Sequence, residues 1–282
     1  MEQLEARGAV VVGGGSGIGR GIALALAAEG VRVLVVDIDG DSAASVCKEI
    51  DGIGGTAHAA QVDATDRDAL TGLAETINDH FGRVHLLACT VGILSHDSVT
   101  GTSDEIWAWH TDFHLMSAVR VVDAFLPLLR AHDEDGHIVI TSSMAGLLAL
   151  PVEQTGGVNT GVYTVLKHAL VGYGDMLRHE VSSDGIGVSI LCPGAVNTNL
   201  GRTTARHRPE RFGGPLPEPP ELEGPPPMAM MQPEEVGRIV VRGIQANRAH
   251  ILSDPVWMGA VDARQQQVLD DFAFFGGTLG SG

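Results

Sequence analysis

Short apolar runs rich in β-branched residues alternate along the chain with longer segments in which apolar residues recur every three or four positions. The first pattern is typical of buried strands and the second of amphipathic helices. Strands are expected at residues 9–12, 31–36, 56–61, 84–89, 137–142, 186–191 and 250–253. Helices are expected at residues 19–29, 41–50, 66–81, 104–132, 161–182 and 233–246. Strands that alternate with helices predict an α/β fold in three layers, with a doubly wound parallel sheet covered on both faces.

One stretch interrupts the alternation. Residues 200–232 show little helical periodicity, and seven prolines fall between residues 215 and 227. A segment of this length without regular structure is uncommon inside a compact domain and often serves as a lid or binding loop. It follows the carboxyl end of a strand, where open α/β sheets bind ligands. We therefore expect a substrate lid within a single domain that spans residues 1–282; the alternatives are a disordered loop or a contact between subunits.

The first expected strand leads into the sequence Gly-Gly-Gly-Ser-Gly-Ile-Gly at residues 13–19, and a helix is expected to follow. Backbone N–H groups at such a turn and the dipole of the helix attract phosphate, and glycines allow its close approach. An ordinary glycine-rich turn is the alternative. Asp37 ends the second expected strand, where a carboxylate bonds the ribose hydroxyls of NAD and repels the 2′-phosphate of NADP. Arg20, the only basic residue nearby, gives weak support for NADP.

Tyr163 and Lys167 lie four residues apart in an expected helix, and therefore on one helix face. The pKa of a free tyrosine is about 10, too high for acid–base catalysis at neutral pH, and a neighbouring ammonium favours the phenolate. Ser143 follows the strand expected at 137–142, at the same sheet edge as the glycine turn, where a hydroxyl can bond a substrate oxygen. Taken alone, a tyrosine–lysine pair also occurs by chance on solvated helices.

In this order the residues resemble those of the short-chain dehydrogenase/reductase family. The glycine spacing is Gly-x-x-x-Gly-x-Gly at Gly13, Gly17 and Gly19, followed by Asp37, Asp63, Ser143, Tyr163-x-x-x-Lys167 and the sequence Pro-Gly-Ala-Val-Asn-Thr at residues 193–198. The resemblance covers residues 8–200. It implies a single Rossmann-like domain, NAD as the cofactor, and Ser143, Tyr163 and Lys167 as the catalytic residues.

The resemblance also implies a role for each site residue. The pyrophosphate of NAD would lie on Gly13, Ser16, Gly17, Ile18 and Gly19, and the adenosine on Asp37, Ile38, Asp63 and Ala64, while the carboxamide of the nicotinamide would lie on Pro193, Gly194, Val196 and Thr198. Cys89 and Val91 would add backbone contacts. Tyr163 would exchange a proton with the substrate oxygen that Ser143 orients. Lys167 would bind the nicotinamide ribose and lower the pKa of the tyrosine.

The sequence departs from the family pattern at three places. Residues 89–92 read Cys-Thr-Val-Gly instead of Asn-Asn-Ala-Gly, which removes polar side chains that stabilise this strand. His114 stands where an asparagine often completes a catalytic tetrad, so the proton path to the lysine either persists with an altered pH dependence or is lost. Additional residues at 152–159 are expected to bulge over the pocket and reshape it.

Composition limits the class of partner and the compartment. Acidic residues outnumber basic ones by 35 to 18, and the net charge of −17 argues against a nucleic-acid partner. Three widely spaced cysteines favour free thiols. Because neither a signal peptide nor a membrane span is apparent, we expect a cytoplasmic protein. His110 and His114 are spaced like helix-borne zinc ligands, but without a third ligand we expect no metal and place them in the active-site wall.

These observations predict an NAD(H)-dependent oxidoreductase that interconverts a secondary alcohol and a ketone. The apolar stretch at residues 147–151 and three lid methionines, Met228, Met230 and Met231, favour an apolar ring or aryl substrate. The alternative is a nucleotide-binding sensor or scaffold with weak or no activity. The family resemblance implies a homo-oligomer, a dimer or a homotetramer, and the apolar tail around Phe272, Phe274 and Phe275 is expected to dock or to contact a subunit.

Overall fold

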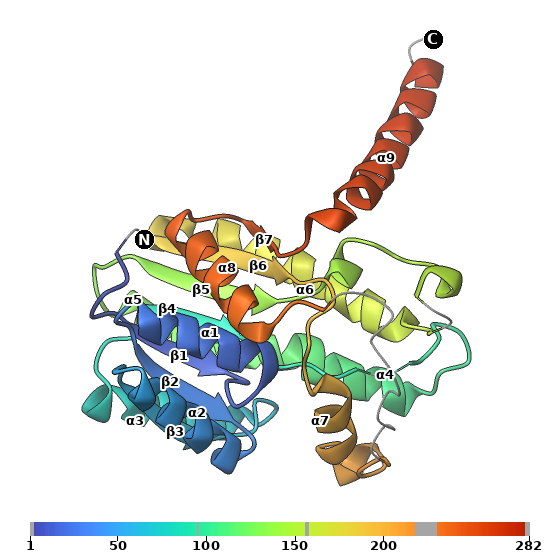
Figure 1. Ribbon diagram of the computed structural model, residues 1–282. Helices are drawn as coiled ribbons and strands as arrows, with labels where there is room; N and C mark the ends of the chain where they lie inside the picture. Colours follow the sequence, from blue (N-terminus) through green and yellow to red (C-terminus); the bar gives the residue numbers. More distant parts are fainter. Residues whose placement is uncertain (1–2, 95, 156–157, 218–229, 280–282) are drawn as a thin grey trace.

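The structure, a computed structural model, describes residues 3–94, 96–155, 158–217 and 230–279. Its strands form one parallel sheet in the order β3-β2-β1-β4-β5-β6-β7 (Figure 1). The strands are β1 (Gly8–Val12), β2 (Arg32–Asp37), β3 (Ala57–Gln61), β4 (Leu86–Cys89), β5 (Gly136–Thr141), β6 (Ile186–Cys192) and β7 (His250–Leu252). The strand order reverses between β1 and β4, and this is the point at which doubly wound sheets bind ligands.

Helices cover both faces of the sheet, as Figure 1 shows. The α-helices are α1 (Gly17–Ala28), α2 (Gly40–Gly52), α3 (Arg67–His80), α4 (Asp104–His110), α5 (Ser117–Arg130), α6 (Gly161–Glu180), α7 (Leu200–Arg206), α8 (Pro233–Gln245) and α9 (Met258–Leu279). Apolar residues of α1, α2 and α8 form one core cluster with one side of the sheet, and those of α3, α5 and α6 form another with the opposite side. The predicted three-layer Rossmann-like fold is confirmed.

The pattern of β1 explains why both faces are covered. All five residues of this strand are buried, because Val10 and Val12 enter the cluster beneath α5 and α6 while Ala9 and Val11 enter the cluster beneath α1 and α8. A strand in the middle of a parallel sheet has no solvent-facing side and therefore reads as a continuous apolar run. On the second of these faces α1 and α8 touch through glycines, since a Cβ at Gly21 would lie 2.0 Å from the carbonyl oxygen of Pro233.

Three segments differ from the sequence predictions. In place of the single helix expected at 104–132, the chain forms α4, a π-helical turn at Thr111–Met116, and α5. Pro127 does not end the last of these, because α5 continues to Arg130. The segment at 200–232 is not without regular structure, because it begins with α7; its residues 218–229 lie outside the described part of the chain. The tail forms α9, a helix that the sequence analysis did not predict. None of the helices in the described ranges is both long and apolar enough to cross a membrane.

Candidate active site

A pocket of about 420 Å³ opens at the carboxyl ends of the strands. It is lined by every residue that the sequence analysis assigned to catalysis or to cofactor binding except Cys89. These residues come from the turn after β1, the ends of β2 and β3, the segment after β4, the end of β5, the first turns of α6 and the segment after β6. Cys89 is buried and instead lines a small neighbouring cavity of about 10 Å³ together with His114, so its side chain does not reach the pocket.

The glycine turn is held against the ends of two strands. Gly13 and Gly17 have φ angles of +80° and +50°, which favour glycine, and the N–H groups of Gly13 and Gly14 donate to the carbonyl oxygen of Val36. A Cβ at Gly19 would lie 2.0 Å from the carbonyl oxygen of Gly13. The backbone therefore excludes larger residues at this position and brings the N-terminus of α1 into the pocket.

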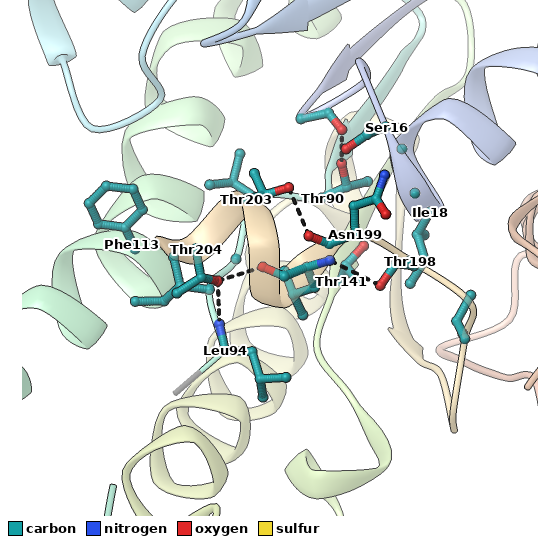
Figure 2. Close-up of a pocket in the computed structure, with 18 of the residues that line it drawn as sticks. Ser16, Ile18, Thr90, Leu94, Phe113, Thr141, Thr198, Asn199, Thr203 and Thr204 are labelled. Carbon is teal, nitrogen blue, oxygen red and sulfur yellow. Dashed lines mark hydrogen bonds between the residues drawn. The ribbon is translucent and has the colours of Figure 1, made fainter. Parts of the chain in front are cut away.

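Thr90 replaces the contacts that the departure at residues 89–92 was expected to remove. Its hydroxyl donates to the carbonyl oxygens of Val12 at 2.8 Å and Gly13 at 3.0 Å, and Figure 2 shows the side chain beside Ser16. This bond ties the segment after β4 to the glycine turn. The strand end is thus stabilised by a polar side chain in spite of the departure.

The carboxylate of Asp37 is fixed at the end of β2. One oxygen accepts from the N–H of Gly15 at 2.8 Å and the other from the N–H of Asp39 at 3.0 Å. Arg20, the basic residue nearby, does not line the pocket, because its guanidinium is engaged by Glu49 and Glu234. The end of β2 therefore presents a negative charge to the pocket. The arginine of α1 does not balance this charge.

Tyr163, Lys167 and Ser143 meet at the inner end of the pocket. The Nζ of Lys167 lies 5.4 Å from the centre of the Tyr163 ring and donates to the carbonyl oxygen of Thr141 at 3.2 Å. Burial lowers the pKa of Lys167 to about 8. Burial also raises the pKa of Tyr163, and the hydrogen bond with Ser143 opposes this rise only in part. The lysine was expected to lower the tyrosine pKa, but here desolvation of the phenolate has the larger effect.

His110 and His114 lie behind this group and not in the pocket wall, contrary to the prediction. His114 belongs to the π-helical turn, is 1% exposed, and packs its ring edge-on against that of Tyr163 at 5.4 Å between centroids. The ring of His110 lies 5.5 Å from that of His114, measured between centroids, and the Nε2 of His110 is 3.6 Å from a carboxylate oxygen of Asp97. Burial lowers the pKa of His110 to about 4 and that of His114 well below its usual value, so both rings are neutral at pH 7.

The outer wall of the pocket combines apolar side chains with the polar side chains of Asn199, Thr203, Thr204 and His207, and most of it was not predicted from the sequence. It includes Ile93, Leu94, Phe113, Leu200 and Met230. In Figure 2 Leu94 and Phe113 lie beside Thr204 of α7, whose hydroxyl accepts from the N–H of Leu94 at 2.8 Å. Leu94 and Phe113 carry no motif, so only the fold brings them together. The stretch at 147–151, which in the sequence predicts an apolar substrate, does not line the pocket; Leu148 is buried in a core cluster with Ile190 and Cys192.

Arginine contacts hold residues 208–211 against α4, the π-helical turn and the segment after β3. Arg211 donates to a carboxylate oxygen of Asp112 at 2.8 Å and to the hydroxyl of Thr65 at 3.2 Å, and Arg208 stacks over the ring of Trp109 at 4.8 Å. At the other end of the segment at 200–232, the N–H of Met231 donates to the carbonyl oxygen of Ala195. The segment is therefore anchored on both sides of the residues that the structure leaves undescribed. Trp109 is buried in the core.

Within the described ranges, one group of three side chains is close enough to share a metal ion: His85, His132 and Glu134. It lies near the amino ends of β4 and β5, at the edge of the sheet opposite the pocket. Glu134 already pairs with Arg7 and Arg83, and His132 bonds the carbonyl oxygen of Val84 at 2.8 Å. Two guanidinium groups at the same carboxylate oppose a cation there.

Sequence comparison relates most of the chain to one family. The family profile described as short chain dehydrogenase matches residues 7–209. The C alpha-dehydrogenase of Sphingobium sp. strain NBRC 103272 / SYK-6 is 25% identical over 97% of this chain and 88% of its own. The 1-deoxy-11-beta-hydroxypentalenate dehydrogenase of Streptomyces exfoliatus is 29% identical over 70% of each chain.

Solved structures give the same relationship. A short-chain dehydrogenase/reductase from Burkholderia phymatum, in complex with NAD, is 26% identical and superposes with a TM-score of 0.83 over 96% of this chain and 97% of its own. The apo form of LigO from Sphingobium sp. strain SYK-6 is 28% identical and superposes with a TM-score of 0.79 over 98% of this chain and 92% of its own. The likeness therefore includes the segments beyond residue 209.

Proposed function

The chain belongs to the short-chain dehydrogenase/reductase family, and from this we propose that it is an NAD(H)-dependent oxidoreductase that interconverts a secondary alcohol and a ketone. The observation that carries the proposal is that Ser143, Tyr163 and Lys167 line the same pocket as the glycine turn and Asp37. A hydroxyl, a phenol and an amine at one end of a pocket, with a phosphate-binding turn and a ribose-binding carboxylate at the other, suit a dinucleotide and a substrate carbonyl.

The residues present fit NAD. The hydroxyl of Ser16 makes no capping bond to α1 and lines the pocket, and the first turn of α1 carries no acidic residue, so this helix end can accept a pyrophosphate. Asp37 would hold the adenosine ribose, and Asp63 with Ala64 would lie beside the adenine. Asp37 disfavours the 2′-phosphate of NADP by charge, and Arg20 is already paired with glutamates.

Bound NAD would supply the hydride acceptor or donor for the reaction. Tyr163 takes the proton from the substrate hydroxyl during oxidation and returns it to the carbonyl oxygen during reduction. Ser143 donates a hydrogen bond to the same oxygen and keeps it within reach of the phenol. Lys167, buried beside Tyr163, would hold the ribose of the cofactor, and its charge favours the phenolate.

We also propose that His114 serves in place of the tetrad asparagine. Both this ring and Lys167 approach Gly92, because a Cβ on Gly92 would be 3.4 Å from Nδ1 of His114 and 3.5 Å from Nζ of Lys167. A neutral imidazole can both donate and accept a hydrogen bond. His114 would therefore keep the proton path behind Tyr163 open without adding a charge.

The apolar wall supports an apolar substrate. Ile93, Leu94, Phe113, Leu200 and Met230 give the outer half of the pocket an apolar surface, beside the polar side chains of Asn199, Thr203, Thr204 and His207. The segment at 200–232 would act as the lid, with α7 as its ordered part. Two relatives are named as dehydrogenases, which agrees with the proposed oxidoreductase activity.

A panel of secondary alcohols and ketones, each assayed with NAD(H) and NADP(H) by the absorbance of the reduced nicotinamide, tests the proposal. We expect turnover of ring or aryl substrates with a preference for NAD(H). Faster turnover with NADP(H) would contradict the role of Asp37, and activity on charged sugars alone would contradict the apolar substrate. Cofactor binding without any turnover would favour the sensor or scaffold.

A further inference from the structure

The chain that follows β6 crosses the cofactor half of the pocket. Its first part lies over the glycine turn, because a Cβ on Gly17 would be 3.2 Å from Cγ2 of Thr198. Further along, His207 lines the pocket. Arg211 then bonds Thr65, which follows the end of β3. The segment therefore runs from the part of the pocket proposed for the pyrophosphate to the part proposed for the adenosine.

Two hydrogen bonds hold Arg211 at the adenosine end. Its Nη2 donates to a carboxylate oxygen of Asp112 at 2.8 Å and to the hydroxyl oxygen of Thr65 at 3.2 Å. The other oxygen of Asp112 accepts from Arg120 at 2.6 Å, so this carboxylate is itself held in place. Arg211 does not line the pocket, so it would act on a bound cofactor through its neighbours.

Thr65 connects Arg211 to Asp63. A guanidinium has no acceptor and an ionised carboxylate has no donor, so the hydroxyl of Thr65 accepts from Arg211 and donates its one hydrogen to Asp63. The Oδ1 of Asp63 accepts from this hydroxyl at 2.8 Å and from the N–H of Thr65 at 2.8 Å. None of the hydrogen bonds between described residues uses the Oδ2 of Asp63, and Asp63 lines the pocket. This oxygen is available to accept from the amino group of an adenine.

We propose that Arg211 is a positioning residue for the adenosine half of the cofactor: through Thr65 it holds the carboxylate of Asp63 in the orientation that accepts from adenine. The inference rests on the NAD(H)-dependent activity proposed above. It adds that the segment expected to cover the substrate also contributes to cofactor binding. Because the side chain of Arg211 is 53% exposed, water competes for its bonds and the effect is expected to be moderate.

The affinity for ADP-ribose, measured by isothermal titration calorimetry on the full chain, tests this role, because ADP-ribose carries the adenosine half without the nicotinamide. Arg211→Gln is expected to weaken binding by about 3- to 10-fold, which is the effect of one hydrogen bond. The affinity for NAD should fall by the same factor, since the nicotinamide half is not involved.

Arg67→Gln is the matched control for Arg211→Gln. The side chain of Arg67 is 52% exposed, close to the value for Arg211, and it also pairs with an aspartate. Its guanidinium donates to Asp123 instead of Thr65. The control should therefore leave the affinities for ADP-ribose and NAD unchanged.

Thr65→Val separates the route through Asp63 from a general effect of charge. The change removes the hydroxyl and keeps the branched shape of the side chain, so it should weaken ADP-ribose binding at least as much as Arg211→Gln does. The double variant should bind no more weakly than Thr65→Val alone, because both changes break the same chain of hydrogen bonds.

The outcomes separate this role from the function on which it rests. A wild type that binds neither ADP-ribose nor NAD would contradict the proposed function. A wild type that binds both, with unchanged affinities in Arg211→Gln, would overturn the role of Arg211 alone. An equal loss in Arg67→Gln, a loss confined to NAD, or losses that multiply in the double variant would overturn that role as well.

Discussion

The Nζ of Lys167 lies 5.4 Å from the centre of the Tyr163 ring, because the two residues are one turn apart on α6 and both face the pocket. Burial acts on both groups in the direction of the neutral form: it lowers the pKa of the amine and raises that of the phenol. Burial therefore disfavours both the ammonium and the phenolate, and the ammonium that can support loss of the phenolic proton is present only below about pH 8.

The lysine gives the first prediction. With a pKa of about 8, Lys167 is an ammonium below this pH and becomes neutral above it, so its support of the phenolate is lost as pH rises through 8. The oxidation rate, measured as kcat against pH, is expected to show an inflection near this value. Lys167→Arg keeps a charged group at all these pH values, and its residual activity should lack the inflection. An identical inflection in the arginine variant would assign it to another group.

The cofactor preference gives the second prediction. Asp37→Ala removes a carboxylate whose charge-assisted bonds to a ribose contribute about 1.5–3 kcal/mol, so kcat/KM for NAD should fall by about 10- to 100-fold. The value for NADP should stay the same or rise, because the repulsion is removed as well.

Asp39→Ala is the matched control for Asp37→Ala. Asp39 caps α2 by accepting from the N–H groups of Asp41 and Ser42, and it does not line the pocket. Its loss should cost about 1 kcal/mol of unfolding free energy and leave the ratio of kcat/KM values for NAD and NADP unchanged. A similar drop in NAD preference for both variants would argue against a specific role of Asp37.

The glycine turn gives the third prediction. Gly19→Ala places a Cβ 2.0 Å from the carbonyl oxygen of Gly13, so the turn must shift, and both stability and NAD binding should decrease. Gly72→Ala on α3 meets no atom within 4 Å and should stabilise the protein by about 0.5–1 kcal/mol with NAD binding unchanged. Urea unfolding and a fluorescence titration with NAD measure the two effects. Normal NAD binding by Gly19→Ala would show that the turn is not the phosphate site.

His114 gives the fourth prediction. His114→Asn retains a side chain that donates and accepts, and kcat should stay within a few-fold of wild type. His114→Phe fills a similar volume without hydrogen-bonding groups, and kcat should fall by about 10-fold or more while KM for NAD is unchanged. Because burial keeps the pKa of His114 well below its usual value, neither variant should move the inflection near pH 8. Equal activity of the asparagine and phenylalanine variants would reduce His114 to a packing residue.

The sheet and the cofactor side of the pocket could be predicted because local patterns determine them. A buried parallel strand such as β1 reads as an apolar run, and the glycine turn needs residues that tolerate a positive φ. Tyr163 and Lys167 lie on the same face of α6 because they are four residues apart in a helix. The positions of these residues relative to one another then follow from the parallel order of the strands.

The substrate side and the tail could not be predicted, because tertiary contacts determine them. Leu94 and Phe113 become pocket residues only through the packing of α7. Thr90 compensates for the missing asparagine by a bond to residues 77 and 78 positions earlier. The length of α9 was missed because the glycines and scattered apolar residues at the end of the chain obscure a helical period. The rise in the pKa of Tyr163 depends on burial, which the spacing of two residues does not reveal.

The most direct measurement of the central claim is the rate of turnover of Tyr163→Phe, compared with that of Tyr173→Phe. Both tyrosines lie on α6, but Tyr173 packs against the core and does not line the pocket. If Tyr163 exchanges the proton of the substrate, its loss should reduce kcat by about 100- to 10,000-fold with NAD binding retained, while Tyr173→Phe remains close to wild type. A Tyr163→Phe variant that turns over substrate at the wild-type rate would contradict the proposed mechanism.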